Sequence, residues 1–316
     1  MLGVFLDEGS LGRGDLDYEA LRRTLPRWQF HDHTPSREVA ERIRDAAVVI
    51  TNKVILTEAH LAAAPGLRLI CISATGTDHV DLDAARRLGI AVCNVPGYAT
   101  ASVTQHVFTL LLALMRSLPA YQQAVADGAW SRSPHFCLLD HPVRELSGKV
   151  LGIVGYGTLG RAVARVAEAF GMEVRVAARP GGPVPEGRLP LDELLPCVDV
   201  LTLHCPLTES TRGLIGARQL AAMKPGAILI NTARGGIVDE EALAQALRSG
   251  HLGGAGVDVL SEEPPPPDHP LLAGDIPRLI LTPHMAWASR EARQRLVDEL
   301  TANIQAWLAG HPRNRV

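Results

Sequence analysis

Aromatic residues are scarce in this chain: Phe, Trp and Tyr make up 4% of its 316 residues, whereas hydrophobic residues as a whole make up 47%. Such a composition favours an α/β protein whose core is rich in alanine, leucine and valine, rather than a β-sandwich. Long hydrophobic runs are also lacking, since the longest, Val107–Met115, is far shorter than the roughly 20 residues that cross a bilayer. We therefore expect no membrane partner.

Neither sign of charge dominates, because 31 Lys and Arg stand against 34 Asp and Glu and give a net charge of −3. This balance argues against a nucleic-acid partner. The five cysteines include no C-x-x-C pair, so the sequence predicts neither a disulfide framework nor a metal site. The N-terminus, MLGVFLDEGS, lacks the basic flank and long apolar region of a signal peptide. We expect a cytoplasmic protein with reduced thiols.

The most informative stretch is Lys149–Gly160, KVLGIVGYGTLG. A short apolar strand runs into Gly155, Gly157 and Gly160, which form a G-x-G-x-x-G turn, and a helical pattern and a second strand (173–178) follow. In such a turn the first glycine permits a tight bend, the second lets backbone approach a pyrophosphate, and the third lets the helix pack close to the strand. The pattern predicts a dinucleotide site at the N-terminus of that helix.

Strand and helix patterns alternate along the chain, which predicts parallel sheets covered by helices. We expect two Rossmann-like domains with doubly wound parallel sheets and the cofactor in the cleft between them. Residues 1–96 with 285–316 form the expected substrate-binding domain, and residues 97–284 the dinucleotide-binding domain, so that the amphipathic helix 290–308 returns to the first half. An apolar helix over 102–118 must be buried, either between the domains or against a second subunit. Residues 130–141 and the Pro/Gly-rich segment 180–190 are expected to be an arm and a loop.

Three side chains near strand ends could carry chemistry. Arg234, in NTARGG, could bind a carboxylate in a bidentate manner, although a surface arginine in a turn is the alternative. His284 ends a strand and could donate a proton to a carbonyl oxygen, with His204 as its competitor. Glu262 and Glu263 could supply a carboxylate beside that histidine, although adjacent glutamates before prolines are more often a solvated loop.

Several segments together resemble one family. GYGTLG, HCPLTESTRGLIG, MKPGAILINTARGGIVDE, GAGVDVLSEEP and LTPHMAWAS are similar to the D-isomer-specific 2-hydroxyacid dehydrogenases, and ATGTDHVDL and NVPGYATASVTQH extend the resemblance through nearly the whole chain. The tail from Thr282 is most similar to the glycerate dehydrogenases and hydroxypyruvate reductases of that family. The resemblance implies a homodimeric oxidoreductase that transfers hydride between a nicotinamide cofactor and a small 2-keto or D-2-hydroxy acid.

Carried over residue by residue, the resemblance makes Arg234 the substrate-orienting cation, His284 the acid/base and Glu263 its partner. It implies substrate contacts from the backbone near Asn52, Lys53, Thr75 and Gly76. Besides the three glycines, the implied cofactor contacts are Leu159, Cys205, Pro206, Thr211, Thr232, Ala233 and Asp258, the last meeting the nicotinamide amide.

One departure from the family bears on the cofactor. Ala178 stands where NAD-using members carry an acidic residue for the ribose hydroxyls, and Arg179 follows it. Loss of the carboxylate removes repulsion against a 2′-phosphate, and the arginine can pair with that phosphate, so we expect NADP(H) to be preferred, with NAD(H) possible. The alternative for the cofactor is that Arg179 stacks on the adenine and that specificity between NADP(H) and NAD(H) is relaxed.

Two alternatives concern the function. The chain could be a related enzyme that acts on phosphoglycerate, formate or phosphite, or a dinucleotide-sensing interaction protein.

Overall fold

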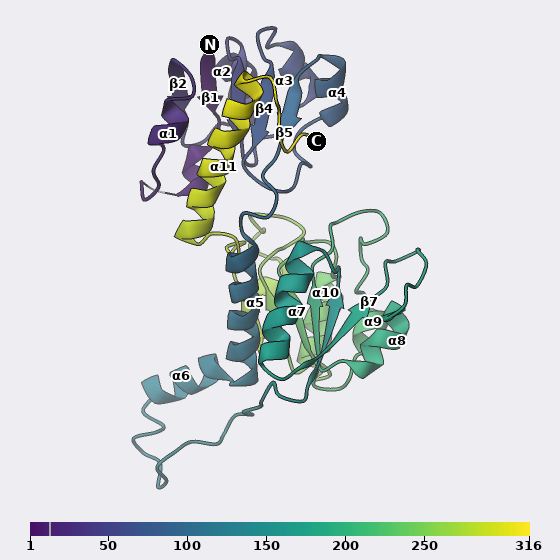
Figure 1. The fold of residues 1–316 in the computed structure, drawn as a ribbon. Coiled ribbons are helices and arrows are strands. Elements are labelled where there is room, and N and C mark those ends of the chain that lie inside the picture. Colours follow the sequence, from purple (N-terminus) through teal and green to yellow (C-terminus); the bar gives the residue numbers. More distant parts are fainter. Residues whose placement is uncertain (13) are drawn as a thin grey trace. The chain divides into compact units, whose positions relative to one another are not determined.

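The computed structural model describes residues 1–12 and 14–316, and within them the chain forms two compact units. Unit 1 contains residues 1–99 and 287–316, and unit 2 contains residues 100–286. Each unit holds one all-parallel sheet, of five and seven strands respectively, which confirms the predicted α/β class (Figure 1).

The sheet of unit 1 has the order β2-β1-β3-β4-β5. Its strands are β1 (Leu2–Phe5), β2 (Arg27–Phe30), β3 (Val48–Thr51), β4 (Leu69–Ile72) and β5 (Ala91–Cys93). The connecting helices are short: α1 (Glu19–Arg22), α2 (Val39–Ile43), α3 (Glu58–Ala62) and α4 (Leu82–Arg87). All residues of β3 and β4 are buried, as expected for strands of a parallel sheet that is covered on both faces.

The C-terminal helix α11 (Arg290–Leu308) completes unit 1. Ser289 caps its first turn by accepting the Ala292 N–H at 3.2 Å. Its apolar stripe packs on one face of the sheet with Phe5, Ile50 and Leu69; the fully or almost fully buried members of the stripe are Leu296, Val297, Leu300 and Ile304. The amphipathic pattern of residues 290–308 therefore predicted both the helix and its return to the first half of the chain.

The sheet of unit 2 has the order β12-β11-β10-β9-β6-β7-β8, a doubly wound topology whose strand order reverses between β6 and β9. Its strands are β6 (Val150–Val154), β7 (Glu173–Ala177), β8 (Arg188–Leu189), β9 (Val200–Leu203), β10 (Ile228–Asn231), β11 (Gly254–Val257) and β12 (Leu279–Leu281). Its helices are α5 (Thr100–Met115), α6 (Leu118–Ala126), α7 (Thr158–Ala169), α8 (Leu191–Leu194), α9 (Ala217–Ala222) and α10 (Glu240–Arg248). In this topology ligands bind at the carboxyl ends of the strands near the reversal, where the glycine turn lies.

The apolar stripe of helix α5 is buried within unit 2. It packs against α7, as Figure 1 shows, and also against β10 and β11. Val107, Leu110, Leu111 and Leu114 lie in the same core cluster as Ile153 and Val163. The sequence left open whether this helix is covered by the other domain or by a second subunit, and in fact its own sheet and α7 cover it.

Two predictions of local structure were wrong. The helix expected over 102–118 ends at Met115, and Ser117, at a φ of 49°, separates it from α6. The expected loop 180–190 contains β8, whose two residues pair with Val176 and Ala177 at the sheet edge. In the described part of the chain, no helix is both long and apolar enough to pass through a membrane.

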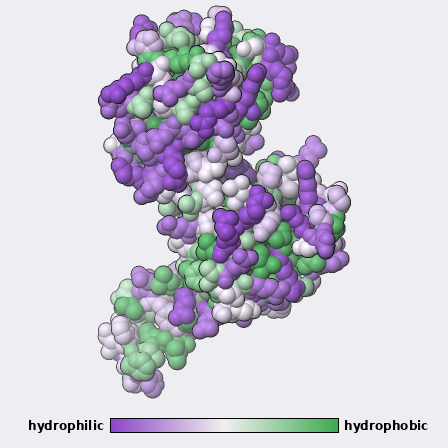
Figure 2. Space-filling model, viewed as in Figure 1, coloured by the Kyte–Doolittle hydropathy of each residue, from purple (hydrophilic) through white to green (hydrophobic). Residues whose placement is uncertain are grey.

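Residues 118–143, which we call the arm, comprise α6 and the segment after it (Figure 1). The arm has internal contacts: Tyr121 donates its hydroxyl to the His141 carbonyl at 2.9 Å, and the Trp130 indole donates to the Phe136 carbonyl at 2.9 Å. Its apolar side chains nevertheless stay exposed, with Phe136 at 91% and Leu139 at 82%, and Figure 2 shows apolar residues on its surface. The arm thus presents an uncovered apolar surface.

Candidate active site

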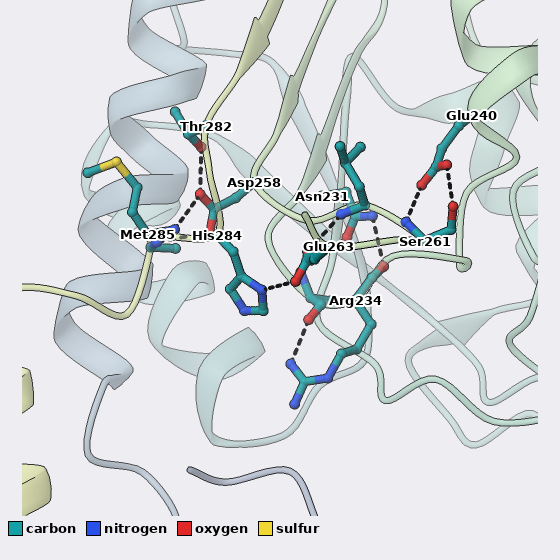
Figure 3. A network of polar contacts seen from close by, with 12 residues as sticks. Asn231, Arg234, Glu240, Asp258, Ser261, Glu263, Thr282, His284 and Met285 are labelled. Carbon is teal, nitrogen blue, oxygen red and sulfur yellow. Dashed lines mark hydrogen bonds and ion pairs between the residues drawn. The ribbon is translucent and has the colours of Figure 1, made fainter. Parts of the chain in front are cut away.

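The three predicted catalytic side chains of unit 2 follow the carboxyl ends of adjacent strands. Arg234 follows β10, Glu263 lies in the segment after β11, and His284 follows β12. Because β10, β11 and β12 are parallel neighbours, the loops after them meet at one edge of the sheet. Figure 3 shows the Arg234, Glu263 and His284 side chains gathered there.

The imidazole of His284 is paired with a carboxylate. Its Nδ1 lies 2.5 Å from Oε2 of Glu263, and the other oxygen of Glu263 accepts the Leu260 N–H at 2.9 Å. The carboxylate therefore holds the proton on Nδ1 and leaves Nε2 as the atom that can exchange a proton with a ligand. This geometry distinguishes Glu263 from its neighbour Glu262.

His284 has a left-handed backbone, with φ at 51°, which is uncommon for a residue other than glycine. Its N–H lies 2.8 Å from the Asp258 carbonyl and 3.0 Å from the Thr282 carbonyl, so its conformation is fixed by bonds to the residues around it. Strained backbone of this kind persists where the surroundings determine it, and it is frequent at functional sites.

Asp258 organises the turn that carries His284. Its carboxylate accepts the Thr282 hydroxyl at 2.6 Å and the amides of Met285 and Ala286 at 3.0 and 2.9 Å (Figure 3). The pKa of Asp258 is lowered: burial acts to raise it, but these bonds and the contact with His106 outweigh burial. The sequence placed Asp258 at the nicotinamide amide, and in the structure this carboxylate already accepts three hydrogen bonds from its own chain.

Arg234 is held by its own loop. The Arg234 carbonyl accepts the Asn231 side-chain amide at 3.1 Å, and the guanidinium donates to the Ala233 carbonyl at 2.8 Å. The following residue must be glycine, because a Cβ at Gly235 would lie 1.9 Å from the carbonyl carbon of Leu260. This close approach brings the loop of Arg234 against the segment that leads to Glu263.

The glycine turn has the geometry of a phosphate-binding loop. Gly155 has a φ of 95°, and a Cβ there would lie 2.5 Å from the Cys205 amide nitrogen. A Cβ at Gly157 would meet no atom of the described residues within 4 Å, so this side of the turn has room for a ligand. No side chain caps α7 at Gly157, which leaves its N-terminal amides facing that space. These residues fit a dinucleotide pyrophosphate.

The other predicted cofactor residues lie around the same edge of the sheet. Leu159 and Gly160 lie in the first turn of α7, Cys205 and Pro206 follow β9, and Thr232 and Ala233 follow β10. The buried Thr232 hydroxyl has no partner among the described residues, as expected for a group that awaits a ligand. Thr211 is different, because its hydroxyl donates to the Pro206 carbonyl at 2.7 Å and accepts the Thr208 amide at 2.7 Å, so it also fixes its own loop.

His204, the competitor of His284, is a poor acid/base. Its Nε2 lies 3.0 Å from the Thr202 hydroxyl, and its Nδ1 is buried with no partner among the described residues. Burial lowers the pKa of His204 to about 4. The ring is therefore neutral at neutral pH and packs beside the strand end.

The predicted substrate residues lie in unit 1, at the ends of β3 and β4. The amides of Asn52 and Lys53 both donate to the carboxylate of Asp7, at 2.9 and 2.7 Å. Burial raises the pKa of Asp7, against the opposing effect of these amides. These two amides thus already donate to a carboxylate of the chain itself, and their assignment to the substrate carboxylate stays a prediction.

Thr75 and Gly76 differ from these residues. The hydroxyl of Thr75 donates to the Val95 carbonyl at 3.0 Å, while the backbone amides of Thr75 and Gly76 have no acceptor among the described residues. Their assignment as substrate contacts stays a prediction. The sequence did not predict the role of Asp7 as the acceptor of the Asn52 and Lys53 amides. The one feature of the sequence that pointed to it was its position as an acidic residue just after the first strand.

Comparisons with known proteins agree with this geometry. A family model described as the NAD binding domain of D-isomer specific 2-hydroxyacid dehydrogenase matches residues 108–286. The chain belongs to this family. It is accordingly an NAD(P)-dependent 2-hydroxyacid dehydrogenase, an oxidoreductase, and the resemblance read from its motifs is confirmed.

Relatives of full length support the assignment. The chain is 46% identical over 309 residues to a glycerate dehydrogenase of Methylorubrum extorquens, an alignment that covers 95% of this chain and 97% of the other. It is 39% identical over 320 residues to a hydroxypyruvate reductase of Blautia hydrogenotrophica, covering 99% and 98%. Among solved structures, an acyclic imino acid reductase (Bsp5) in complex with NADPH and D-Arg matches with a TM-score of 0.87 and 28% identity over 100% of both chains.

Proposed function

We propose that the chain reduces hydroxypyruvate or glyoxylate to the corresponding 2-hydroxy acid, giving D-glycerate in the first case, and that Arg234, Glu263 and His284 carry the reaction. The observation that carries this proposal is the 2.5 Å pair of His284 Nδ1 and Glu263 Oε2, on the strand-end loops that also hold Arg234. The two relatives named glycerate dehydrogenase and hydroxypyruvate reductase support the choice of substrate.

Each side chain then has a definite task. The Arg234 guanidinium binds the substrate carboxylate and orients the carbonyl group. A bound nicotinamide supplies the hydride that reaches the carbonyl carbon. His284 delivers a proton from Nε2 to the carbonyl oxygen, and Glu263 stabilises the imidazolium that exists before this transfer. In the reverse direction His284 accepts the hydroxyl proton of the 2-hydroxy acid.

We propose NADP(H) as the preferred cofactor. Ala178, at the end of β7, is buried and offers no carboxylate to repel a 2′-phosphate, while Arg179 is exposed beside it. The NADPH in the complex of the acyclic imino acid reductase is a property of that protein, and it is compatible with this choice.

We also propose a homodimer in which the arm covers a second copy of the chain. The exposed Phe136 and Leu139 favour such a contact, because large apolar side chains gathered on one projecting segment mark an interaction site. The family resemblance also implies a homodimer, and because the apolar stripe of α5 is already covered within its own unit, the arm is the better candidate for the contact.

The test of the reaction is turnover. Purified protein is mixed with NADPH or NADH and with hydroxypyruvate, glyoxylate or pyruvate, and the loss of cofactor absorbance is followed. We expect NADPH with hydroxypyruvate or glyoxylate to be fastest. His284→Asn should lose most of this rate and keep its affinity for the cofactor, whereas His311→Asn, an exposed histidine near the C-terminus, should behave as wild type.

The same assay separates the alternatives. Cofactor binding without oxidation by any keto acid contradicts the reductase proposal and favours a dinucleotide-sensing role. Oxidation with formate, phosphite or phosphoglycerate alone favours the other substrate classes. A faster rate with NADH retains the enzyme and contradicts the cofactor proposal.

A further inference from the structure

Arg188 lies over the ring of Tyr156, the residue between the first two glycines of the phosphate turn. Its guanidinium carbon is 5.6 Å from the Tyr156 ring centroid, within the range of a cation–π contact. Arg188 is in β8, the short edge strand inside the segment expected to be a loop. No role for this arginine follows from the family motifs quoted above.

Strand register places Arg188 on the face where the dinucleotide turn lies. Arg188 pairs with Val176 of β7, and paired residues of neighbouring strands point to the same face of a sheet. Val174, two residues before Val176, shares that face and packs in the cluster that contains α7 residues and Tyr156. The Arg188 side chain therefore lies on the α7 side of the sheet, next to the start of that helix.

The same strand ends bring Arg179 close in the fold. Ala178 donates its N–H to the Leu189 carbonyl at 2.7 Å, so the residue before Arg179 is bonded to the residue after Arg188. Within the described residues, neither arginine lies within 4.0 Å of a carboxylate in an ion pair. Two arginines without an acidic ion-pair partner among the described residues thus lie beside the last residues of β7, near which an adenosine ribose lies in a doubly wound dinucleotide domain.

We propose that Arg188, held by the Tyr156 ring, is a specificity-determining residue that binds the 2′-phosphate of NADP(H) together with Arg179. The inference rests on the proposed cofactor preference and deepens it. A phosphate dianion pairs with two guanidinium groups through charge-assisted hydrogen bonds, and the aromatic ring fixes one of them in advance. NAD(H), which carries hydroxyls at that position, gains nothing from Arg188.

The experiment measures binding without turnover. Isothermal titration calorimetry with 2′,5′-ADP and with 5′-ADP is carried out on wild type, Arg188→Ala, Arg179→Ala and the matched control Arg165→Ala, an exposed arginine one turn along α7 from Arg161. We expect Arg188→Ala to raise the Kd for 2′,5′-ADP about tenfold and to change the Kd for 5′-ADP less than about twofold. Tyr156→Phe, which keeps the aromatic ring, should retain wild-type discrimination.

Each other outcome has a separate meaning. Equal weakening of both ligands, or of neither, in Arg188→Ala overturns the inference. If Arg179→Ala loses the discrimination while Arg188→Ala keeps it, the NADP(H) preference stands and the role of Arg188 does not. If wild type binds 2′,5′-ADP and 5′-ADP equally well, both the NADP(H) preference and the role of Arg188 are contradicted. If wild type binds 2′,5′-ADP more tightly than 5′-ADP but reduces none of the keto acids, only the substrate proposal is contradicted.

Discussion

His204 makes the stability of unit 2 depend on pH in a direction that the structure fixes. Burial lowers its pKa to about 4 from an ordinary value of 6.5, so the folded protein holds the ring neutral where the unfolded chain protonates it. A lowered histidine pKa contributes stability that is present above 6.5 and is lost as the pH falls toward 4. Unfolding should therefore become easier between pH 6.5 and pH 4.

The size of the effect follows from proton linkage. With pKa values of about 4 and 6.5, moving from pH 7.5 to pH 5 costs about 2 kcal/mol of unfolding free energy. His204 is half-buried as a residue, but its Nδ1 is fully buried without a partner among the described residues. Because part of the residue is accessible to solvent, the expected effect is about 1 to 2 kcal/mol.

The assay compares wild type with His204→Gln, whose amide replaces Nε2 opposite Thr202 and does not titrate. Urea unfolding is followed by circular dichroism at pH 7.5 and pH 5, and hydrogen exchange of the β9 peptide assigns the transition to unit 2. Wild type should lose about 1 to 2 kcal/mol more than the variant on acidification. An identical loss in both proteins refutes the reasoning, because other groups, such as His79 with a pKa lowered to about 4 chiefly by burial, would then account for the whole change.

Three further perturbations test other parts of the molecule. Glu263→Gln removes the charge beside His284 and should lower kcat about 10- to 100-fold, as expected for the loss of a charge-assisted hydrogen bond. The control Glu262→Gln should leave kcat unchanged. Equal kcat values of the two variants in steady-state assays would contradict the assignment of Glu263. Leu111→Ala removes a fully buried side chain of α5 and should lower the unfolding free energy by about 2 to 5 kcal/mol, measured by urea unfolding. A loss below about 1 kcal/mol would show that α5 is not packed as described. Replacing Phe136 and Leu139 of the arm with Asp should shift sedimentation from dimer to monomer without lowering the unfolding free energy of unit 2; an unchanged dimer would exclude the arm as the interface.

Much of the site could be read from the sequence because it depends on local pattern. Arg234 and His284 each directly follow a short apolar strand, and parallel strands bring such ends to one edge of a sheet. The G-x-G-x-x-G spacing of Gly155, Gly157 and Gly160 is likewise a local pattern, because it is required by a tight bend and by a helix that packs close to the preceding strand. These features need no knowledge of contacts between distant parts of the chain.

The remainder depends on pairing through space, which leaves no periodic signal. Asp7 meets the amides of Asn52 and Lys53 across 45 and 46 residues, so nothing near it in sequence reveals its partners. The resemblance implies that Asp258 meets the nicotinamide amide, but only the fold reveals that its carboxylate accepts hydrogen bonds from Thr282 and Ala286. Strand β8 escaped notice because two residues after a Pro/Gly-rich segment are too few to show alternation.

The two-segment construction of unit 1 has a consequence for synthesis on the ribosome. Residues 1–99 are translated before unit 2, but the face of their sheet that carries Phe5 and Ile50 packs against α11, which is translated after unit 2. At about 5 to 20 residues per second, translation of residues 100–286 takes roughly 10 to 40 s, during which this apolar face lacks its contacts with α11. The whole of unit 2 is synthesised before α11, the last helix of unit 1. The nascent chain therefore passes through a stage at which the dinucleotide-binding unit can fold while unit 1 still exposes apolar residues that chaperones can bind.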